Sequence, residues 1–177
     1  MKHLLLITIT MISLGSTSAQ HSSNVFDAAR IGDIATLRAL AAADPDTLNS
    51  HDHKGFTPLI LAIYNDQQEA SEYLLSQQVK TNAQDNAGNT ALMGATFKGY
   101  ASLAKLLIQS GASVNIRNYN GATALTFAAT FGREEIAQIL LNNGAELNVK
   151  DAYGNTPLAY AKSQGNESMV ALLQNQP

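Results

Sequence analysis

Residues 118–133 read 118-NYNGATALTFAATFGR-133, and 33 positions earlier 85-DNAGNTALMGATFKGY-100 has the same skeleton. Four columns of identical residues continue this step along the chain. They are Gly55, Gly88, Gly121 and Gly154; Thr57, Thr90, Thr123 and Thr156; Leu59, Leu92, Leu125 and Leu158; and Ala62, Ala95, Ala128 and Ala161. Columns in register at this period predict a stacked array of similar supersecondary units.

Each unit begins with residues that favour a turn. An Asp or Asn stands three positions before each column glycine, where its side chain can bond to its own backbone while the glycine takes a positive φ. These residues are Asp52, Asp85, Asn118 and Asp151. The column threonine follows two positions after the glycine and is placed to cap a helix, and Pro58 and Pro157 fall at the first helical position.

Two helices are expected after each turn. The first is short and ends near Asp66, Gly99, Gly132 or Gly165, and its small residues allow a neighbouring helix to come close. The second carries an apolar stripe, which comprises Leu103, Leu106 and Leu107 in one unit and Ile136, Ile139 and Leu140 in the next. Gly111 and Gly144 end it. The sequence therefore predicts an all-α fold, an α-solenoid of about five helix-turn-helix repeats with β-turn finger tips.

These units resemble ankyrin repeats, whose pattern runs D-x-x-G-x-T-P-L-H-x-A-x-x-x-G, then an apolar helix and G-A-x-V-N. The closest matches are 151-DAYGNTPLAYAKSQG-165 and 111-GASVN-115, and 26-FDAARIGDIATLRALAAADPDTLN-49 resembles an opening repeat. The resemblance covers residues 24–177 and implies repeats at about 24–50, 51–84, 85–117, 118–150 and 151–177. It also implies a protein-binding function, with contacts made by the turn tips and the first helices.

The chain departs from the family pattern at several positions. The histidine of T-P-L-H is replaced in every unit, by Ile60, Met93, Thr126 and Ala159. Gln78 stands where later units have Gly111 and Gly144, at a position that favours positive φ. Gly94 lies inside a first helix, where glycine is unfavourable relative to alanine. The second and third units are therefore predicted to be the least stable part of the array.

The N-terminal segment, residues 1–19, has the pattern of a secretory signal peptide. Lys2 precedes the apolar run LLLITITMISL, and Thr17 and Ala19 suit a signal-peptidase site before Gln20. The run is too short to span a bilayer, which takes about 20 apolar residues, so no membrane insertion is expected after cleavage. A buried N-terminal helix is the alternative interpretation. Residues 20–23 would form a short linker, and residues 24–177 the repeat domain.

Charge and cysteine content narrow the class of protein further. The chain has 11 basic and 14 acidic residues, and removing Lys2 with the signal would change the net charge from −3 to −4. This mild charge, without a basic patch, gives no indication of nucleic-acid binding. An exported chain without cysteine has to be stabilised by packing alone. A bacterial periplasm is the expected location, with secretion as second choice.

The sequence contains no enzyme motif, so no catalytic residues and no cofactor are predicted. One local cluster, His51-Asp52-His53, has side chains that could ligate Zn²⁺ or Cu²⁺. It supports an alternative function as a metal or small-ligand carrier. The simpler interpretation is a solvated loop in which Asp52 holds the turn, because two or three ligands leave a metal site incomplete.

Aromatic residues are unevenly distributed. Six of the eleven in the chain fall on the turn tips and first helices that would form the concave face of a solenoid. The expected protein-binding residues are Phe56, Tyr64, Phe97, Lys98, Tyr119, Phe131 and Tyr153. Aromatic groups on one surface among Asn, Ser and Lys favour a protein interface, although Phe97 and Phe131 could instead pack between units. The sequence thus predicts a non-catalytic scaffold that stabilises, localises or inhibits a protein partner.

Overall fold

The structure is a computed structural model and describes residues 24–175. The predicted signal peptide and linker, residues 1–23, lie outside this range. The described residues form ten α-helices and one 3₁₀-helix, η1. In chain order these are α1 (Val25–Ile31), α2 (Ile34–Ala43), η1 (Pro45–Asn49), α3 (Pro58–Tyr64), α4 (Gln68–Ser76), α5 (Ala91–Lys98), α6 (Ala101–Gln109), α7 (Ala124–Thr130), α8 (Glu134–Asn142), α9 (Pro157–Ser163) and α10 (Glu167–Gln174).

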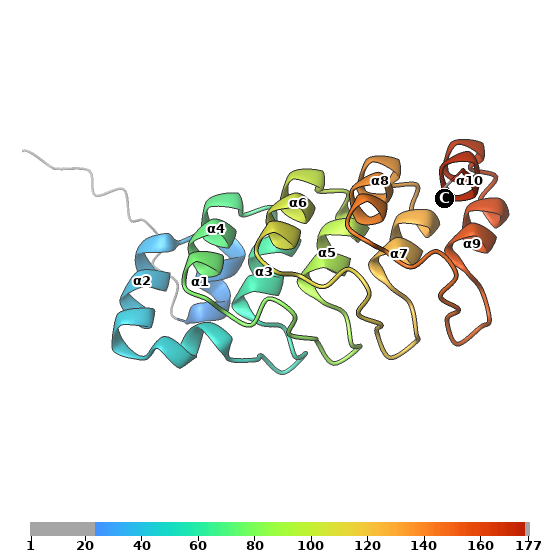
Figure 1. The fold of residues 1–177 in the computed structure, drawn as a ribbon. Coiled ribbons are helices and arrows are strands. Elements are labelled where there is room, and N and C mark those ends of the chain that lie inside the picture. The colour runs from blue at the N-terminus through green and yellow to red at the C-terminus, as the bar shows by residue number, and fades with distance from the viewer. Residues whose placement is uncertain (1–23, 176–177) are drawn as a thin grey trace, which may run out of the picture.

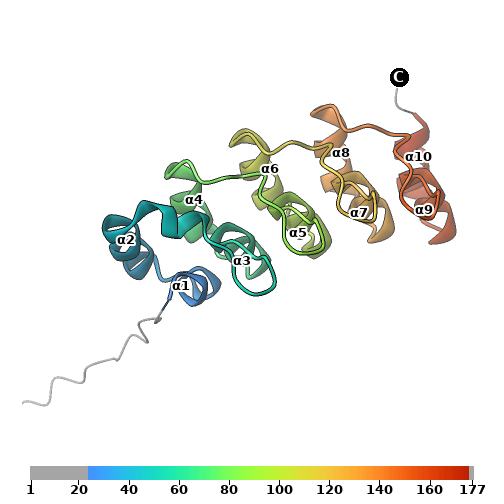
Figure 2. The ribbon, with the colours of Figure 1, turned by 90° about the horizontal axis from the view of Figure 1, so that it is seen from below.

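The helices pair along the chain and the pairs stack in a single row (Figure 1). The first helices, α1, α3, α5, α7 and α9, each contact the next, and the second helices form a parallel row behind them. The array curves gently, with the first helices on its concave side (Figure 2). This arrangement confirms the predicted all-α solenoid.

The loops between successive pairs project beyond the helices as turns, here called fingertips: residues 52–56, 85–89, 118–122 and 151–155. The Asx side chain organises each one, as the sequence predicted. Oδ1 of Asp85 accepts the amides of Ala87 and Asn89, both at 2.8 Å, and the other three fingertips repeat this pair of bonds. The column glycine has a positive φ in all four, at 76–80°.

The fingertips also touch one another. The amide of Tyr119 donates to the carbonyl of Ala87 at 3.1 Å, and one such bond joins each of the other two neighbouring pairs of fingertips. A Cβ on Gly88 would stand 2.6 Å from the nitrogen of Tyr119, so the glycine is required by close approach as well as by φ. Gly154, in the last fingertip, has nothing within 4 Å of its Cβ position.

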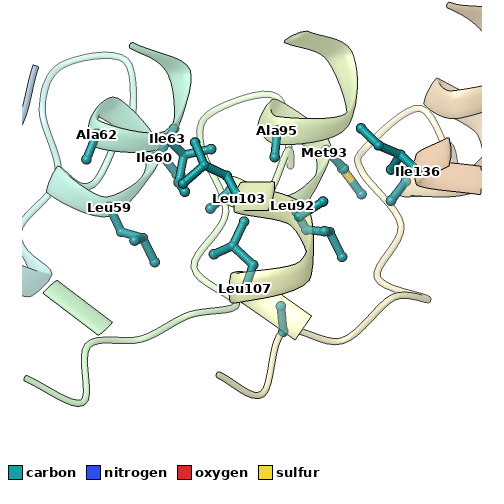
Figure 3. Packing of buried hydrophobic residues seen from close by; sticks show 14 of the residues in the cluster. Leu59, Ile60, Ala62, Ile63, Leu92, Met93, Ala95, Leu103, Leu107 and Ile136 are labelled. Carbon is teal, nitrogen blue, oxygen red and sulfur yellow. The ribbon is translucent and has the colours of Figure 1, made fainter. Parts of the chain in front are cut away.

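The threonine, leucine and alanine columns build the helix starts and the core. Each column threonine accepts the amide three positions on, and Pro58 and Pro157 occupy the first helical turn. The four column alanines are fully buried, which lets the neighbouring helices approach closely. Figure 3 shows Ile60 and Ile63 of α3 directed toward α5 and α6, with Leu103 of α6 beside Ile63; all three are buried.

The predicted stripe on the second helices is partly wrong. Leu103, Leu107, Ile136 and Leu140 are buried, but Leu106 and Ile139 are only half-buried. Their expected places in the core are taken by two alanines, Ala104 and Ala137, each fully buried. A methyl side chain at the tightest point lets the second helix lie close to its first helix, so residue size rather than hydrophobicity selects the buried position.

A column of asparagines, which was not predicted from the sequence, joins the units through the segments that follow the second helices. Asn82 accepts the amide of Ser113 at 2.9 Å and donates to the carbonyl of Gly111 at 3.3 Å. Asn49 and Asn115, which occupy the same position in the preceding and following units, each accept an amide from the next unit in the same way. A single polar residue per unit therefore ties each loop to the next.

The departures from the family pattern have specific structural outcomes. Gln78 does adopt a positive φ of 56°, and so does Asp66, which was not expected. At the position of the missing histidine, Ile60 and Met93 are buried as apolar core. Thr126 replaces the lost hydrogen bonds instead, since its hydroxyl accepts the amide of Thr123 at 3.1 Å in a reciprocal capping box.

Candidate protein-binding groove

Four rings from the first helices form a continuous row, here called the aromatic row: Tyr64, Phe97, Phe131 and Phe127. The Tyr64 and Phe97 rings are stacked with centroids 6.0 Å apart, and Phe97 meets Phe131 edge to face at 4.8 Å. Phe127 lies 6.1 Å from Phe131. Each contact is within the range of favourable aromatic pairs. Three units therefore contribute to one apolar strip.

The aromatic row remains open to solvent, although its members support one another. Tyr64 is 38% exposed and Phe131 42% exposed, while Phe97 and Phe127 are half-buried. The alternative in which both phenylalanines are ordinary core is therefore wrong for Phe131, which is exposed. It holds only in part for Phe97, which is half-buried. Large apolar groups that stay exposed on a contiguous strip are a feature of interaction surfaces.

Gly94 has a role in this row that sequence reasoning missed. A Cβ at Gly94 would lie 3.0 Å from Cδ2 of Tyr64, so glycine leaves room for the ring against α5. Glycine is unfavourable inside a helix relative to alanine, but at this position its missing side chain leaves space for the exposed Tyr64 ring. The equivalent positions in other units hold the larger residues Leu61, Phe127 and Tyr160, so only the unit whose first helix packs beside Tyr64 has a glycine there.

A first pocket, of about 260 Å³, opens between α3, α5 and the second fingertip. Its lining includes Phe56, Tyr64, Phe97 and Phe127, together with the buried carboxylate of Asp85. Burial raises the pKa of Tyr64, and the charge of Asp85 raises it further. The Tyr64 hydroxyl therefore stays protonated at neutral pH and can donate a hydrogen bond.

A second pocket, of about 200 Å³, lies between α7, α9 and the last two fingertips. Phe127 and Phe131 line one part of it, and Tyr153 and Tyr160 of the last unit line another. Asp151 is the one acidic side chain among the lining residues. Its Oδ2 accepts the Tyr160 hydroxyl, while Oδ1 accepts the amides of Tyr153 and Asn155 at 2.9 and 3.0 Å.

The hydrogen bonds around Asp151 keep it charged. Burial raises the pKa of Asp151, but the bonds from Tyr160 and from the amides of Asn155 and Tyr153 outweigh burial and bring that pKa below its ordinary value of 3.8. The bond to Asp151 in turn raises the pKa of Tyr160. The second pocket thus combines four aromatic rings with one carboxylate that is ionised at neutral pH.

The other expected site residues take different positions. Lys98 lies beside the aromatic row, with its Nζ 5.5 Å from the centre of the Tyr64 ring. Tyr153 is 78% exposed at the mouth of the second pocket, and Tyr119 is 71% exposed but lines neither pocket. Its ring covers Gly88 of the preceding fingertip instead. The structure therefore brings six of the seven residues to one groove and leaves Tyr119 apart.

Phe127 and Tyr160 belong to the groove and were not predicted. They occupy the same position in successive units, but Leu61 and Gly94 stand at that position in the preceding units, so the column gives no common aromatic signal. Phe127 lines both pockets and connects them. The assignment of all these residues to partner binding stays a prediction.

The His51-Asp52-His53 loop has the geometry of a turn. Oδ1 of Asp52 accepts the amides of Lys54 and Phe56 at 2.8 and 2.9 Å, and both histidines are exposed. Within residues 24–175, no group of three or more His, Cys, Asp or Glu side chains is placed to hold a metal ion. Over the same residues, every helix is too short or too polar to cross a bilayer.

Comparison with known families agrees with this architecture. The sequence matches the family model described as ankyrin repeats (3 copies) over residues 25–118 and again over residues 111–176. The chain therefore belongs to the ankyrin-repeat family. Ankyrin repeats generally mediate protein–protein interactions and are typically non-catalytic. A search of curated proteins found no match.

Proposed function

We propose that this protein is an exported, non-catalytic binding module that docks a periplasmic protein along the groove formed by the fingertips and the first helices. The partner would be stabilised, localised or inhibited by being held there. The single observation that carries the proposal is the aromatic row, which stays exposed across three units and opens into a pocket on each side of Phe127.

The composition of the groove suits a protein partner. Aromatic side chains are the commonest binding hot spots, and they act best when polar groups around them exclude water. Here Asn89, Asn118 and Asn120 supply polar groups within or beside the pockets. The fully buried core behind α3, α5 and α7 holds the rings in place, which reduces the ordering cost of association.

The first test is capture of partners from periplasmic extract by the immobilised protein, with the retained proteins identified by mass spectrometry. A variant carrying Tyr64→Ala, Phe131→Ala and Tyr153→Ala should lose the retained partner. Truncating a hot spot usually costs more than about 1–2 kcal/mol, so affinity should fall by at least about 100-fold for three. These residues are exposed, so circular dichroism should show that the variant is folded.

The matched control truncates three exposed residues on the second helices, Glu72→Ala, Lys105→Ala and Glu135→Ala. This control should retain the same partner with unchanged affinity. If the control variant loses the partner and the groove variant keeps it, binding occurs on the convex helices and the proposal is wrong.

Export is tested separately, because binding does not depend on it. Expression of the full chain in a Gram-negative host, followed by fractionation, should place the protein in the periplasm. N-terminal sequencing should find a chain that begins at Gln20. An unprocessed chain in the cytoplasmic fraction would contradict the proposed location and leave the groove proposal intact.

A further inference from the structure

The second pocket has the chemistry of a site for a positively charged side chain. Its described lining residues include Phe127, Phe131, Tyr153 and Tyr160, and Asp151 is the only charged residue among them. Aromatic faces carry negative potential and attract cations, most strongly where water is partly excluded. A carboxylate beside those rings adds an attraction of the same sign. No positive side chain among the lining residues neutralises it.

The chain places its own cations on two tyrosine rings outside this pocket. The ammonium of Lys98 lies 5.5 Å from the centre of the Tyr64 ring, next to the first pocket. On the opposite helix row, the guanidinium of Arg38 lies 4.7 Å from the centre of the Tyr73 ring. The rings of the second pocket have no such internal partner among the described residues, although Asp151 is there to complete a pair.

We propose that the second pocket receives a lysine or arginine side chain from the partner protein, held between the rings of α7 and those of the last unit and paired with Asp151. This inference rests on the proposed function, since it names the chemistry of the partner segment that enters the groove. The apolar stem of such a side chain would pack on Phe127 and Phe131 while its charged end reaches the carboxylate.

The chain supplies a conservative variant for the test. Asn118 holds its fingertip with the same two amide bonds as Asp151 does, at 3.1 and 2.9 Å. Asp151→Asn should therefore keep the turn and remove the charge, and it also exchanges the oxygen that accepts the Tyr160 hydroxyl for an NH2 group. Asp52→Asn makes the same change in the first fingertip, outside the pocket, and serves as the matched control. Tyr153→Leu, at a residue 78% exposed, removes one ring without disturbing the core.

The probes are three capped tripeptides, Gly-Lys-Gly, Gly-Arg-Gly and Gly-norleucine-Gly, titrated into isotopically labelled protein and followed by NMR. The lysine or arginine peptide should shift the signals of Thr130, Phe131, Tyr153 and Tyr160, and the neutral peptide should not. Asp151→Asn should weaken binding about three- to fivefold, as for a solvent-accessible ion pair. Tyr153→Leu should also weaken it, and Asp52→Asn should leave it unchanged.

Equal shifts with the neutral peptide, or unchanged affinity in Asp151→Asn, would overturn the inference. So would shifts confined to another part of the array. The capture experiment separates this failure from failure of the proposed function. A partner lost by the triple groove variant but bound equally by Asp151→Asn would show that the groove binds protein by other means and that this pocket is not a cation site.

Discussion

Gln78 and Asp66 have the same backbone conformation, with φ at 56°, in positions where other units use glycine. Side chains other than glycine are disfavoured there because Cβ comes too close to the following carbonyl oxygen, and Asp tolerates this conformation better than Gln. Gly111, at the position equivalent to Gln78, has nothing within 4 Å of its Cβ position. No neighbouring group would therefore clash with a side chain at this position, and only the positive φ disfavours one.

Gln78→Gly should raise the free energy of unfolding by about 0.5–1 kcal/mol, because the strain removed exceeds the added flexibility of the unfolded chain. The measurement is urea denaturation followed by circular dichroism. Gly111→Ala is the converse control and should lower stability by about 1 kcal/mol. Equal stability of Gln78→Gly and the parent chain would mean that the side chain of Gln78 makes a compensating interaction.

Tyr160→Phe tests the hydrogen bond to Asp151 through its pH dependence. The folded-state pKa of Asp151 lies below its ordinary value of 3.8. The bond therefore contributes stability above about pH 4, and this contribution is lost as the pH falls through the folded-state pKa. The variant should lose about 1 kcal/mol at pH 7, and the difference in stability from the parent should shrink as the pH falls through the folded-state pKa of Asp151. A difference that stays constant as the pH is lowered throughout the acidic range in which the protein stays folded would contradict this account.

Among the helices, the second of each pair differ in how they begin. Asp33 caps α2 by accepting the amide of Thr36, and Asn166 caps α10 by accepting that of Met169. Gln67, Tyr100 and Arg133, at the starts of α4, α6 and α8, make no such side-chain bond. Gln67 nevertheless has nearly the backbone angles of Asn166, with φ −87° and ψ 78° against −86° and 87°.

Shortening the side chain at this position should create the missing cap. Gln67→Asn keeps the amide group and brings its oxygen within reach of the amide of Ala70, so stability should rise by about 0.5–1 kcal/mol. For a domain of this size the melting temperature should rise by about 1–4 °C, as calorimetry would measure. Asn166→Gln, the reverse change in α10, should lower it. A lower melting temperature for Gln67→Asn would show that contacts of the longer side chain with Gly32 are more important than the cap.

At this scale most of the structure could be predicted from the sequence. The repeat columns locate the turns, caps and helix pairs because each column has a local role, as the threonine caps do. The stripe was predicted less well, since apolar character does not distinguish Leu106, which is half-buried, from Ala104, which is buried. Which of two apolar residues is buried depends on the distance between helices, and that distance is a tertiary property.

For the whole array, stability is expected to vary along its length. A solenoid unit contacts only its neighbours, so local weaknesses are not averaged over one core. Amides of residues 51–117 should exchange faster with solvent than those of residues 118–150. The second unit has the two strained φ angles, and Gly94 lies in the third. Native-state hydrogen exchange measures this directly, and slower exchange in residues 51–117 would refute it.

The groove is also a property of the whole array, which explains why sequence columns described it incompletely. The aromatic row changes column as it crosses the units: Tyr64 and Phe97 share one column, but Phe131 stands one position beyond it. Individual exposed aromatics could be assigned to the concave side from their place in the repeat. Phe127 and Tyr160 were missed because their column also contains Leu61 and Gly94, so it shows no common chemistry.

The small number of hydrogen bonds between neighbouring fingertips gives the protein unequal stiffness. On the helix side, a continuous buried core resists any change in the spacing of the units. At the fingertips, each step has one backbone bond, such as that from Tyr119 to Ala87, and the first two steps add one side-chain bond each, from Asn86 to the carbonyl of His53 and from Asn118 to Oδ1 of Asn89. Each bond contributes only about 1 kcal/mol. The fingertip edge can therefore open or close while the helices stay packed. The array would adjust its curvature to the partner by changing the spacing of the fingertips, which is also where the partner makes contact.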